Sequence, residues 1–338
     1  MSPETTNALL AAAAFALAWV TARVTTPRLI EAAGRLGIVD RPDGRLKQQK
    51  RPVPYLGGIA VALGVLVALG ITYRFEQQLL AILLSGSIVL VLGLVDDLGS
   101  LSPQAKLAGQ LLATLALIKA GVFIKLVFLP WWVTIPATIL WMLAATNAFN
   151  LIDVMDGLSS GVGAVAALFF GAIAFAAGLG PTAFLGAALA GALLGFRHYN
   201  VEPARIYLGD TGSLFSGFVL GALAIVNHYT VVHRLAAIVP LLILAVPLFD
   251  MLFVMWVRWR RGLPVMLGSP DHVALRLRKW RLSTRATVRV NVAVALLAGT
   301  SGILVMVAPL PWAIGVLAVL ASLAVIAAVW LRTIDMSL

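Results

Sequence analysis

The 338-residue sequence contains no cysteine and only four histidines. The lack of cysteine excludes a disulfide framework and a thiolate metal site, and four histidines leave little room for a multi-histidine metal centre. Charged residues make up only 12% of the chain, whereas soluble globular domains have roughly 25%. We therefore expect lipid, and not water, to be the main solvent of this chain.

Three sequence patterns are also missing. No G-x4-G-K-[ST] motif occurs, which excludes a P-loop nucleotide site. The residues before the first apolar run include Glu4 but no lysine or arginine, so we expect that run to be a retained span and not a cleavable signal peptide. The polar–apolar alternation of a transmembrane barrel is absent, and the chain is therefore predicted to cross the membrane with helices.

Long apolar runs make up most of the sequence, which is 61% hydrophobic with a mean hydropathy of +0.99. A bilayer is spanned by about 20 apolar residues. The sequence predicts an all-α, polytopic membrane helix bundle of about eleven transmembrane helices, forming one domain over residues 1–338. The eleven runs are Asn7–Val24, Tyr55–Ile71, Leu79–Leu94, Leu107–Gly121, Trp131–Ala148, Leu158–Gly178, Pro181–Phe196, Leu214–Val226, Ala236–Val257, Val288–Val307 and Trp312–Leu331.

The net charge is +11, from 25 lysines and arginines against 14 acids. In a membrane protein this excess is typical of basic cytoplasmic loops beside anionic lipid, and we predict no nucleic-acid partner. Only four bases fall at the boundaries on one side, and the other twenty-one fall on the opposite side. The sequence therefore predicts a multi-pass protein of the inner (cytoplasmic) membrane, with an external N-terminus and a cytoplasmic C-terminus.

The acids follow the same division. The predicted external side holds only Glu4 and Glu76, and eight aspartates fall on the cytoplasmic side. Acids at the ends of helices far apart in sequence predict an active site at the cytoplasmic face. The alternative is that acids accumulate wherever the loops are longer. The eight are Asp40, Asp43, Asp96, Asp97, Asp153, Asp156, Asp210 and Asp271.

Asp96 and Asp97 close the third apolar run. Adjacent carboxylates beside lipid are costly unless they are solvated, paired or bound to a cation. On a helix they point about 100° apart, so one is free to face a metal while the other takes a proton or meets Lys106. A solvated helix cap is the structural alternative.

Polar residues recur every three positions at the end of the fifth run, at Asn147, Asn150, Asp153 and Asp156, before Gly157. On a helix this spacing predicts one polar strip that leads out of the membrane. Hydrogen bonds between helices are the alternative interpretation.

A short polar motif, Gly209-Asp-Thr-Gly-Ser213, opens the eighth run. A helix N-terminus favours anions, and small residues let backbone N–H groups approach a phosphate. Asp210 in this place is suited to Mg²⁺, which takes carboxylate and phosphate oxygens together. An ordinary aspartate N-cap is the alternative.

Two predicted cytoplasmic loops are basic, at residues 41–51 and 258–289. Such loops can hold a diphosphate, a lipid phosphate or the anionic leaflet, and topology alone accounts for most of their charge. Asp250 lies inside the ninth run, where an acid either serves a functional site or is the buried partner of an arginine or an amide.

Taken in order along the chain, these motifs resemble the polyprenyl-phosphate N-acetylhexosamine-1-phosphate transferase family, and the resemblance covers roughly Leu36 to Leu282. That family includes the muramoyl-pentapeptide translocase and the N-acetylglucosamine (GlcNAc)-1-phosphate transferases that start lipopolysaccharide O-antigen and teichoic acid assembly. Eleven spans are similar to the GlcNAc branch. The resemblance rests on residues 52–58, Val95-Asp-Asp97 with Lys106 and Gln110, residues 147–158, residues 200–213, and Pro247-Leu-Phe-Asp250.

The resemblance implies roles for individual residues. Asp210 is implied as the main Mg²⁺ ligand with Asp97, and Mn²⁺ is an alternative ion. Asp96, Asp97 and Asp156 are implied as the catalytic acids. The substrate-binding set is implied to be Lys50, Arg51, Lys106, Asn147, Asn150, Asp153, Asn200, Tyr207, His272 and Arg276, with Asn200 and Tyr207 at positions that contact uracil.

One departure from the family pattern stands out. Members carry H-x-H-H-R-L in the last large cytoplasmic loop, whereas this chain has His272-Val-Ala-Leu-Arg276-Leu. Asp153-Val-Met-Asp156 also replaces the common D-G-x-D. The first change leaves the choice of sugar open.

The predicted reaction transfers a sugar-1-phosphate, GlcNAc-1-phosphate first among candidates, from a UDP-sugar to polyprenyl (undecaprenyl) phosphate, with release of UMP. The partners are then the UDP-sugar, polyprenyl phosphate and the lipid bilayer, and a homodimer is left open. Two alternatives remain: a secondary transporter, and a catalytically degenerate family member that binds lipid phosphate without turnover.

Overall fold

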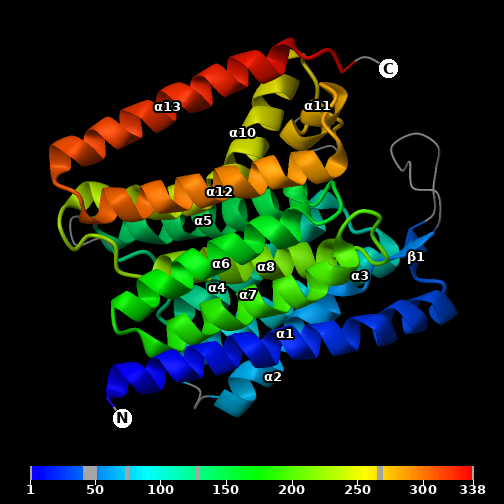
Figure 1. Ribbon diagram of the computed structural model, residues 1–338, viewed down its shortest axis with the longest axis horizontal. Coiled ribbons are helices and arrows are strands. Elements are labelled where there is room, and N and C mark those ends of the chain that lie inside the picture. The colour runs from blue at the N-terminus through cyan, green and yellow to red at the C-terminus, as the bar shows by residue number, and fades with distance from the viewer. Residues whose placement is uncertain (1, 41–51, 73–75, 126–128, 265–268, 337–338) are drawn as a thin grey trace. The chain divides into compact units, whose positions relative to one another are not determined.

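The computed structural model describes residues 2–40, 52–72, 76–125, 129–264 and 269–336 (Figure 1). The described part is almost entirely helical, which confirms the predicted fold class. One antiparallel pair of two-residue strands aligns Val39 with Pro54. The elements are α1 (Pro3–Leu36), β1 (Val39–Asp40), β2 (Val53–Pro54), α2 (Gly57–Thr72), α3 (Gln77–Gly99), α4 (Pro103–Lys119), α5 (Trp131–Ile152), α6 (Leu158–Ala176), α7 (Gly180–Asn200), α8 (Gly209–Val226), η1 (Arg234–Ile238), α9 (Val239–Ile243), α10 (Ala245–Arg260), α11 (Val273–Lys279), α12 (Thr284–Val307) and α13 (Leu310–Thr333).

Three helices begin at serine caps that can be read directly from the sequence. The side chains of Ser2, Ser102 and Ser283 each accept a hydrogen bond from the backbone N–H three residues later. Proline follows Ser2 and Ser102 at the first helical position, where its missing N–H costs no hydrogen bond. These caps set where α1, α4 and α12 begin.

The chain divides into two compact units, Met1–Asn227 and His228–Leu338. The first unit contains α1 to α8 with the strand pair. In it α8 packs against α2, α3, α5 and α6, while α7 lies between α1 and α6. Most residues of α6 and α8 are buried, so these two helices form the centre of the first unit. The prediction that residues 1–338 form one domain stays a prediction.

Glycine allows very close helix contacts around the start of α8. A Cβ atom added at Gly58 would lie 2.2 Å from the backbone nitrogen of Gly212. One added at Gly93 would lie 2.4 Å from the carbonyl oxygen of Asp210. Side chains larger than hydrogen are therefore excluded on α2 and α3 where these helices meet α8. This close packing brings the end of α3 against the start of α8.

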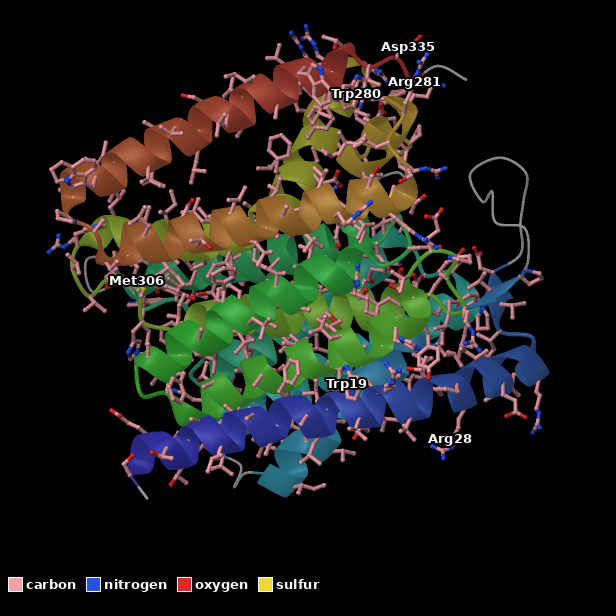
Figure 2. The ribbon with its side chains drawn as sticks, in the orientation of Figure 1. Trp19, Arg28, Trp280, Arg281, Met306 and Asp335 are labelled. Atoms are coloured by element: carbon pink, nitrogen blue, oxygen red, sulfur yellow. The ribbon has the colours of Figure 1, made fainter. Side chains whose placement is uncertain are left out.

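The second unit contains η1 and α9 to α13. Helix α12 packs against η1, α9, α10, α11 and α13. Figure 2 shows Trp280 and Arg281, between α11 and α12, beside the end of α13 that leads to Asp335. The Trp280 ring meets the Trp330 ring edge to face at 4.9 Å between centroids. Met306 lies at the other end of α12. The short helix α11 therefore lies at the end of α12 that is remote from Met306.

Seven helices of the described residues are long and apolar enough to cross a membrane, and the bent pair of η1–α9 with α10, which turns by 78°, raises the number to eight. The chain is thus a multi-pass membrane protein. The predicted count of eleven is not confirmed. The other three predicted spans do form helices: α2 has 16 residues and α4 has 17, short of about 20, and α7 is rich in glycine and ends in Arg197-His-Tyr-Asn200.

Candidate active site

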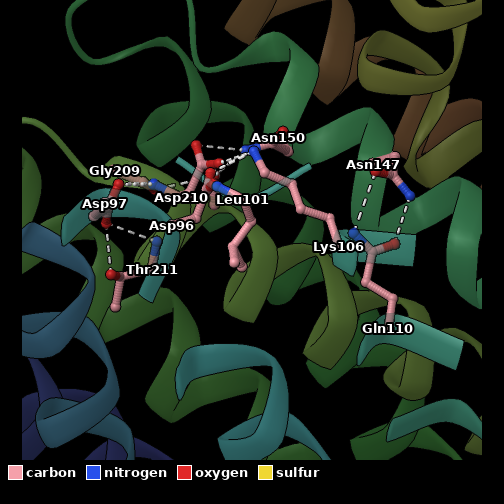
Figure 3. Close-up of polar contacts among 11 residues, drawn as sticks. Asp96, Asp97, Leu101, Lys106, Gln110, Asn147, Asn150, Gly209, Asp210 and Thr211 are labelled. Carbon is pink, nitrogen blue, oxygen red and sulfur yellow. Dashed lines mark hydrogen bonds and ion pairs between the residues drawn. The ribbon is translucent and has the colours of Figure 1, made fainter. Parts of the chain in front are cut away.

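The first element of the site is the contact between Asp97 on α3 and the N-terminus of α8 (Figure 3). The Asp97 carboxylate accepts hydrogen bonds from Asp210 N at 2.9 Å, Thr211 N at 3.0 Å and Thr211 Oγ1 at 2.6 Å. The first N–H groups of a helix have no partner within it. Asp97 therefore acts as a cap supplied by another helix, and it fixes where the Asp210 side chain emerges.

Gly209 is required at this junction for two reasons. Its φ is +72°, a left-handed conformation that side-chain-bearing residues rarely adopt. A Cβ added here would also lie 2.6 Å from the Asp97 carboxylate oxygen. The glycine lets the chain turn into α8 directly beneath the capping carboxylate.

Lys106, near the start of α4, links the acids of two other helices. Its Nζ donates to Asp210 Oδ2 at 2.7 Å and also forms an ion pair with Asp96. The second Asp96 oxygen accepts from Leu101 N at 2.6 Å. Two carboxylates thus share one ammonium group at the junction of α3, α4 and α8.

Asn150, on α5, holds the other oxygen of Asp210. Its Nδ2 donates to Asp210 Oδ1 at 2.9 Å and to Ser213 Oγ at 3.1 Å. Asp210 is therefore fixed from two directions, by Lys106 on α4 and by Asn150 on α5. Such a carboxylate keeps its orientation when a charged ligand arrives.

Gln110 and Asn147 form an amide pair about one helical turn away from Lys106 on α4 and from Asn150 on α5. Asn147 Nδ2 donates to Gln110 Oε1 at 2.6 Å, and Gln110 Nε2 donates to Asn147 Oδ1 at 3.3 Å (Figure 3). The resemblance implied a substrate contact for Asn147. Both polar atoms of its side chain are instead bonded to protein groups.

The two acids that follow α5 lie in a turn and not on the helix, because α5 ends at Ile152. Asp156 Oδ2 accepts from Ala204 N at 2.9 Å. Burial of the Asp153 carboxyl group raises its pKa well above 3.8, and the nearby Asp210, Asp97 and Asp156 carboxylates raise it further. The predicted strip therefore consists of two amides on the helix and two acids on the turn.

Asn200 ties this turn to the end of α7. Its Oδ1 accepts from Gly157 N and Ser160 Oγ, both at 3.0 Å, and its Nδ2 donates to Ile206 O at 3.0 Å. The residue is only 3% exposed. The contact with uracil that the resemblance implied is not supported by this geometry, since both carbonyl lone pairs are occupied. We assign Asn200 to holding the turn in place.

Tyr207 lies in the segment between α7 and α8, beside the strand β2. Its backbone N–H donates to Pro54 O at 2.8 Å, and its side chain is half-buried. Burial, with smaller contributions from Asp156, Asp40 and Asp153, raises the pKa of its phenol to about 12. The ring therefore carries a neutral hydroxyl at neutral pH.

His272 and Arg276 lie in the second unit and have protein partners there. His272 Nδ1 lies 2.7 Å from Asp250 Oδ2, and Asp250 Oδ1 accepts from Val273 N at 2.7 Å. Asp250 is thus a buried partner, as the structural alternative held, but its side-chain partner is a histidine and not an arginine or an amide.

Arg276 has no exposed surface, and it donates to Asp271, Leu331 O and Ile334 O. The predicted contact of Arg276 with phosphate is not supported, because its guanidinium is buried and bonded to protein groups.

Five predicted residues come together in the first unit: Asp96, Asp97, Lys106, Asn150 and Asp210. Lys50 and Arg51 lie outside the described residues. Two functional side chains carried no role at the sequence level, Gln110 and Thr211. For Thr211 the signal was its place as the third residue of a helix that begins with a polar motif. For Gln110 it was the four-residue spacing from Lys106 on one helix face.

The described residues contain no group of three or more histidine, cysteine or acidic side chains that could hold a metal ion. Asp96 and Asp210 nevertheless face the same ammonium group. Mg²⁺ is commonly held by one or two carboxylates together with phosphate oxygens of the substrate and water. The residues present therefore fit an ion that arrives with a phosphorylated substrate, and not a preformed metal cage.

Helical membrane spans that converge on a lysine-bridged cluster of acids at the start of a buried helix define a class of multi-pass membrane enzymes that act on phosphorylated substrates. The chain belongs to the family described as glycosyl transferase family 4, whose model matches residues 79–228. That match spans α3 to α8 and includes the whole cluster.

Similar proteins agree with this assignment. The chain is 32% identical to a probable undecaprenyl-phosphate N-acetylglucosaminyl 1-phosphate transferase of Bacillus subtilis, over 82% of this chain and 80% of the relative. It is 31% identical to a decaprenyl-phosphate N-acetylglucosaminephosphotransferase of Mycobacterium tuberculosis, over 73% and 70%. It is 36% identical to a phospho-N-acetylmuramoyl-pentapeptide-transferase of Synechococcus, over 63% and 65%.

Proposed function

We propose that this protein transfers GlcNAc-1-phosphate from UDP-GlcNAc to a polyprenyl phosphate and releases UMP. The observation that carries the proposal is Asp210 at the start of α8, with one oxygen bound by Lys106 and the other by Asn150. Two relatives that share most of the chain are named for GlcNAc phosphate transfer to undecaprenyl or decaprenyl phosphate. The UDP-sugar donor is part of the proposal.

The reaction forms one bond and breaks one. An oxygen of the polyprenyl phosphate attacks the β-phosphorus of UDP-GlcNAc, and the bond from that phosphorus to the bridging oxygen breaks. The electron pair leaves with UMP, and the product is a polyprenyl diphosphate sugar. The attacking oxygen is already negatively charged, so positioning and charge neutralisation supply most of the catalysis.

Mg²⁺, with Mn²⁺ as the alternative, is the proposed cofactor, and Asp210 and Asp96 are the residues that would hold it. When bound, it neutralises charge on the diphosphate as UMP leaves. Lys106 stays close to both carboxylates and meets the phosphate oxygens of the bound substrate. Asp97 was expected as a second ligand, but its oxygens already accept three hydrogen bonds, and we assign it to holding the start of α8.

The remaining residues are given roles from their surroundings. Asp96, which forms an ion pair with Lys106, acts in catalysis as a carboxylate that would hold the cation together with Asp210. Asp156 and Asp153 line the turn after α5 and face the donor substrate. Tyr207, half-buried and neutral, offers a ring on which a base can stack. In this proposal the site faces the cytoplasm, where UDP-sugars are made, and the protein lies in the inner membrane.

The proposal is tested with purified protein in neutral-detergent micelles, supplied with Mg²⁺, undecaprenyl phosphate and a panel of UDP-sugars. We expect UMP to be released only when lipid phosphate and a UDP-N-acetylhexosamine are both present, with UDP-GlcNAc the best donor. Omission of Mg²⁺ or addition of EDTA should stop release. If no UDP-sugar gives UMP with well-folded protein, the proposal is wrong.

A further inference from the structure

We infer that the Gln110–Asn147 amide pair is a positioning device that sets the distance between Lys106 and Asn150 across Asp210. The inference rests on the proposed function for its kinetic consequences. It gives a role to Gln110, and it replaces the substrate contact expected of Asn147. Both side chains are positioning residues, since neither touches the carboxylates of the cluster among the contacts of the described residues.

The four residues lie in matching places on their two helices. Gln110 follows Lys106 by four residues on α4, and Asn147 precedes Asn150 by three on α5. Residues three or four apart share a helix face one turn apart. Each helix therefore carries one residue that binds Asp210 and, one turn away on the same face, one amide of the pair.

The amide pair fixes the register between the two helices. Each amide offers one donor and one acceptor to the other, and the two bonds of 2.6 and 3.3 Å close a ring. Asn147 Nδ2 also donates to Leu143 O at 2.8 Å, which holds its side chain along α5. Gln110 is 1% exposed. A slip of either helix would leave a buried amide without its partner, which is costly in an apolar surrounding.

The register set by the amide pair determines the contacts made one helical turn away, at Asp210. Lys106 Nζ and Asn150 Nδ2 approach opposite oxygens of Asp210 at 2.7 and 2.9 Å, and a shift of α4 against α5 would lengthen one contact. A misplacement of about 1 Å in a catalytic group can lower a rate about a hundredfold. The amide pair is neutral and carries no proton in the reaction, so its effect is on geometry alone.

The test is a double-mutant cycle with Gln110→Leu, Asn147→Leu and the double variant, measured for thermal stability, kcat and KM for UDP-GlcNAc. Gln110→Leu leaves the half-buried Asn147 amide without its partner on α4, and Asn147→Leu leaves the buried Gln110 amide without its partner on α5. We therefore expect a lower Tm in each single variant than in the double variant, which leaves neither amide. We expect kcat to fall about tenfold or more in all three, with KM within about twofold of the original. The double variant is decisive because it separates stability from positioning.

Two further variants complete the design. The exchange of Gln110→Asn together with Asn147→Gln keeps one donor and one acceptor on each helix, and we expect it to recover Tm and part of kcat. Thr114→Val is the matched control, because Thr114 is buried on the same helix but bonds only to the carbonyl of Gln110 in its own helix. It should leave kcat and KM unchanged.

Three results would overturn the inference. The first is a change in Tm in the double variant that equals the sum of the changes in the two single variants, because the Gln110 and Asn147 side chains would then not be coupled. The second is a wild-type kcat in the double variant. The third is a large rise in KM for Asn147→Leu alone, which would make Asn147 a substrate contact. The Tm cycle needs no substrate, so it still decides on the pair if the wild-type protein shows no transfer and the proposed function fails.

Discussion

At the scale of single residues, Asp210 is the side chain on which the site depends most. Its two oxygens are bound from two helices by Lys106 and Asn150, and its backbone N–H is capped by Asp97. We predict that Asp210→Asn lowers turnover to less than about a tenth of wild type, a loss of more than about 1.4 kcal/mol in transition-state stabilisation. The reason is that the amide removes the charge that faces the cation and diphosphate.

The measurement is UMP release by the purified variant over a range of Mg²⁺ concentrations, with Tm as the check on folding. Asparagine has nearly the same size and does not disturb the backbone bond to Asp97, so the Tm should stay close to wild type. A variant that is folded and retains more than a tenth of the rate would remove Asp210 from its central role.

Arg276 illustrates how burial changes an expectation drawn from charge. It is fully buried and bonded to Asp271 and to two carbonyl oxygens at the end of α13. We predict that Arg276→Ala destabilises the protein by about 3–5 kcal/mol, because it leaves the buried Asp271 without its main partner. KM for UDP-GlcNAc in the surviving folded protein should be unchanged.

The matched control for this prediction is Arg278→Ala, two residues further along α11, where the side chain is exposed. Thermal unfolding should show a large loss for the first variant and almost none for the second. A raised KM with an unchanged Tm for Arg276→Ala would restore the phosphate contact that the sequence predicted.

At the scale of elements, the start of α8 depends on Gly209. The residue has a φ of +72° and no space for a Cβ beside Asp97. We predict that Gly209→Ala costs roughly 1–2 kcal/mol from the left-handed backbone alone, and more from displacement of the capping carboxylate. Turnover should fall with it, because the cap sets the position of Asp210.

Gly70→Ala serves as the comparison, since that glycine lies in α2 with nothing within 4 Å of a Cβ and should tolerate alanine. Tm and kcat are measured for both variants. Equal behaviour of the two would show that the close approach at Gly209 is relaxed in solution and that the cap does not position the site.

The helices also show how much of the fold could be predicted from the sequence. Apolar runs predicted where helices form, but three of the predicted runs began at Asn7, Leu107 and Val288, after the serine caps at which α1, α4 and α12 start. The period of three from Asn147 to Asp156 predicted a helical strip, but the helix ends at Ile152. The turn that follows is held by Asn200, which bonds to Gly157 and Ser160 from forty or more residues away, and no local pattern contains that contact.

The residues of the candidate site were partly predictable from the sequence. The motifs identified Asp96, Asp97 and Asp210 because acids next to apolar runs are costly and therefore informative. The division of labour among them was not predictable. Whether a carboxylate caps a helix, as Asp97 does, or faces a lysine, as Asp96 does, depends on the close packing of α3 against α8, and that packing appears in the sequence only as separate glycines.

At the scale of the whole molecule, membrane orientation follows from charge. The bases divide twenty-one to four between the two predicted sides, and cytoplasmic loops carry the excess of lysine and arginine. We predict a cytoplasmic C-terminus and an external N-terminus. Paired fusions at each end, with one reporter active only outside and one active only inside, measure this directly. A C-terminal fusion active only outside would overturn the orientation, together with the predicted odd number of spans.

The central claim is that a phosphosugar, and not a sugar alone, is transferred to the lipid. The most direct measurement uses UDP-GlcNAc labelled at the β-phosphorus, with undecaprenyl phosphate, Mg²⁺ and the purified protein, followed by separation of lipid and water phases. We expect the label to move into the lipid phase in equal amount to the UMP released, and we expect Asp210→Asn to prevent this movement. Release of labelled UDP, with unlabelled lipid, would contradict it.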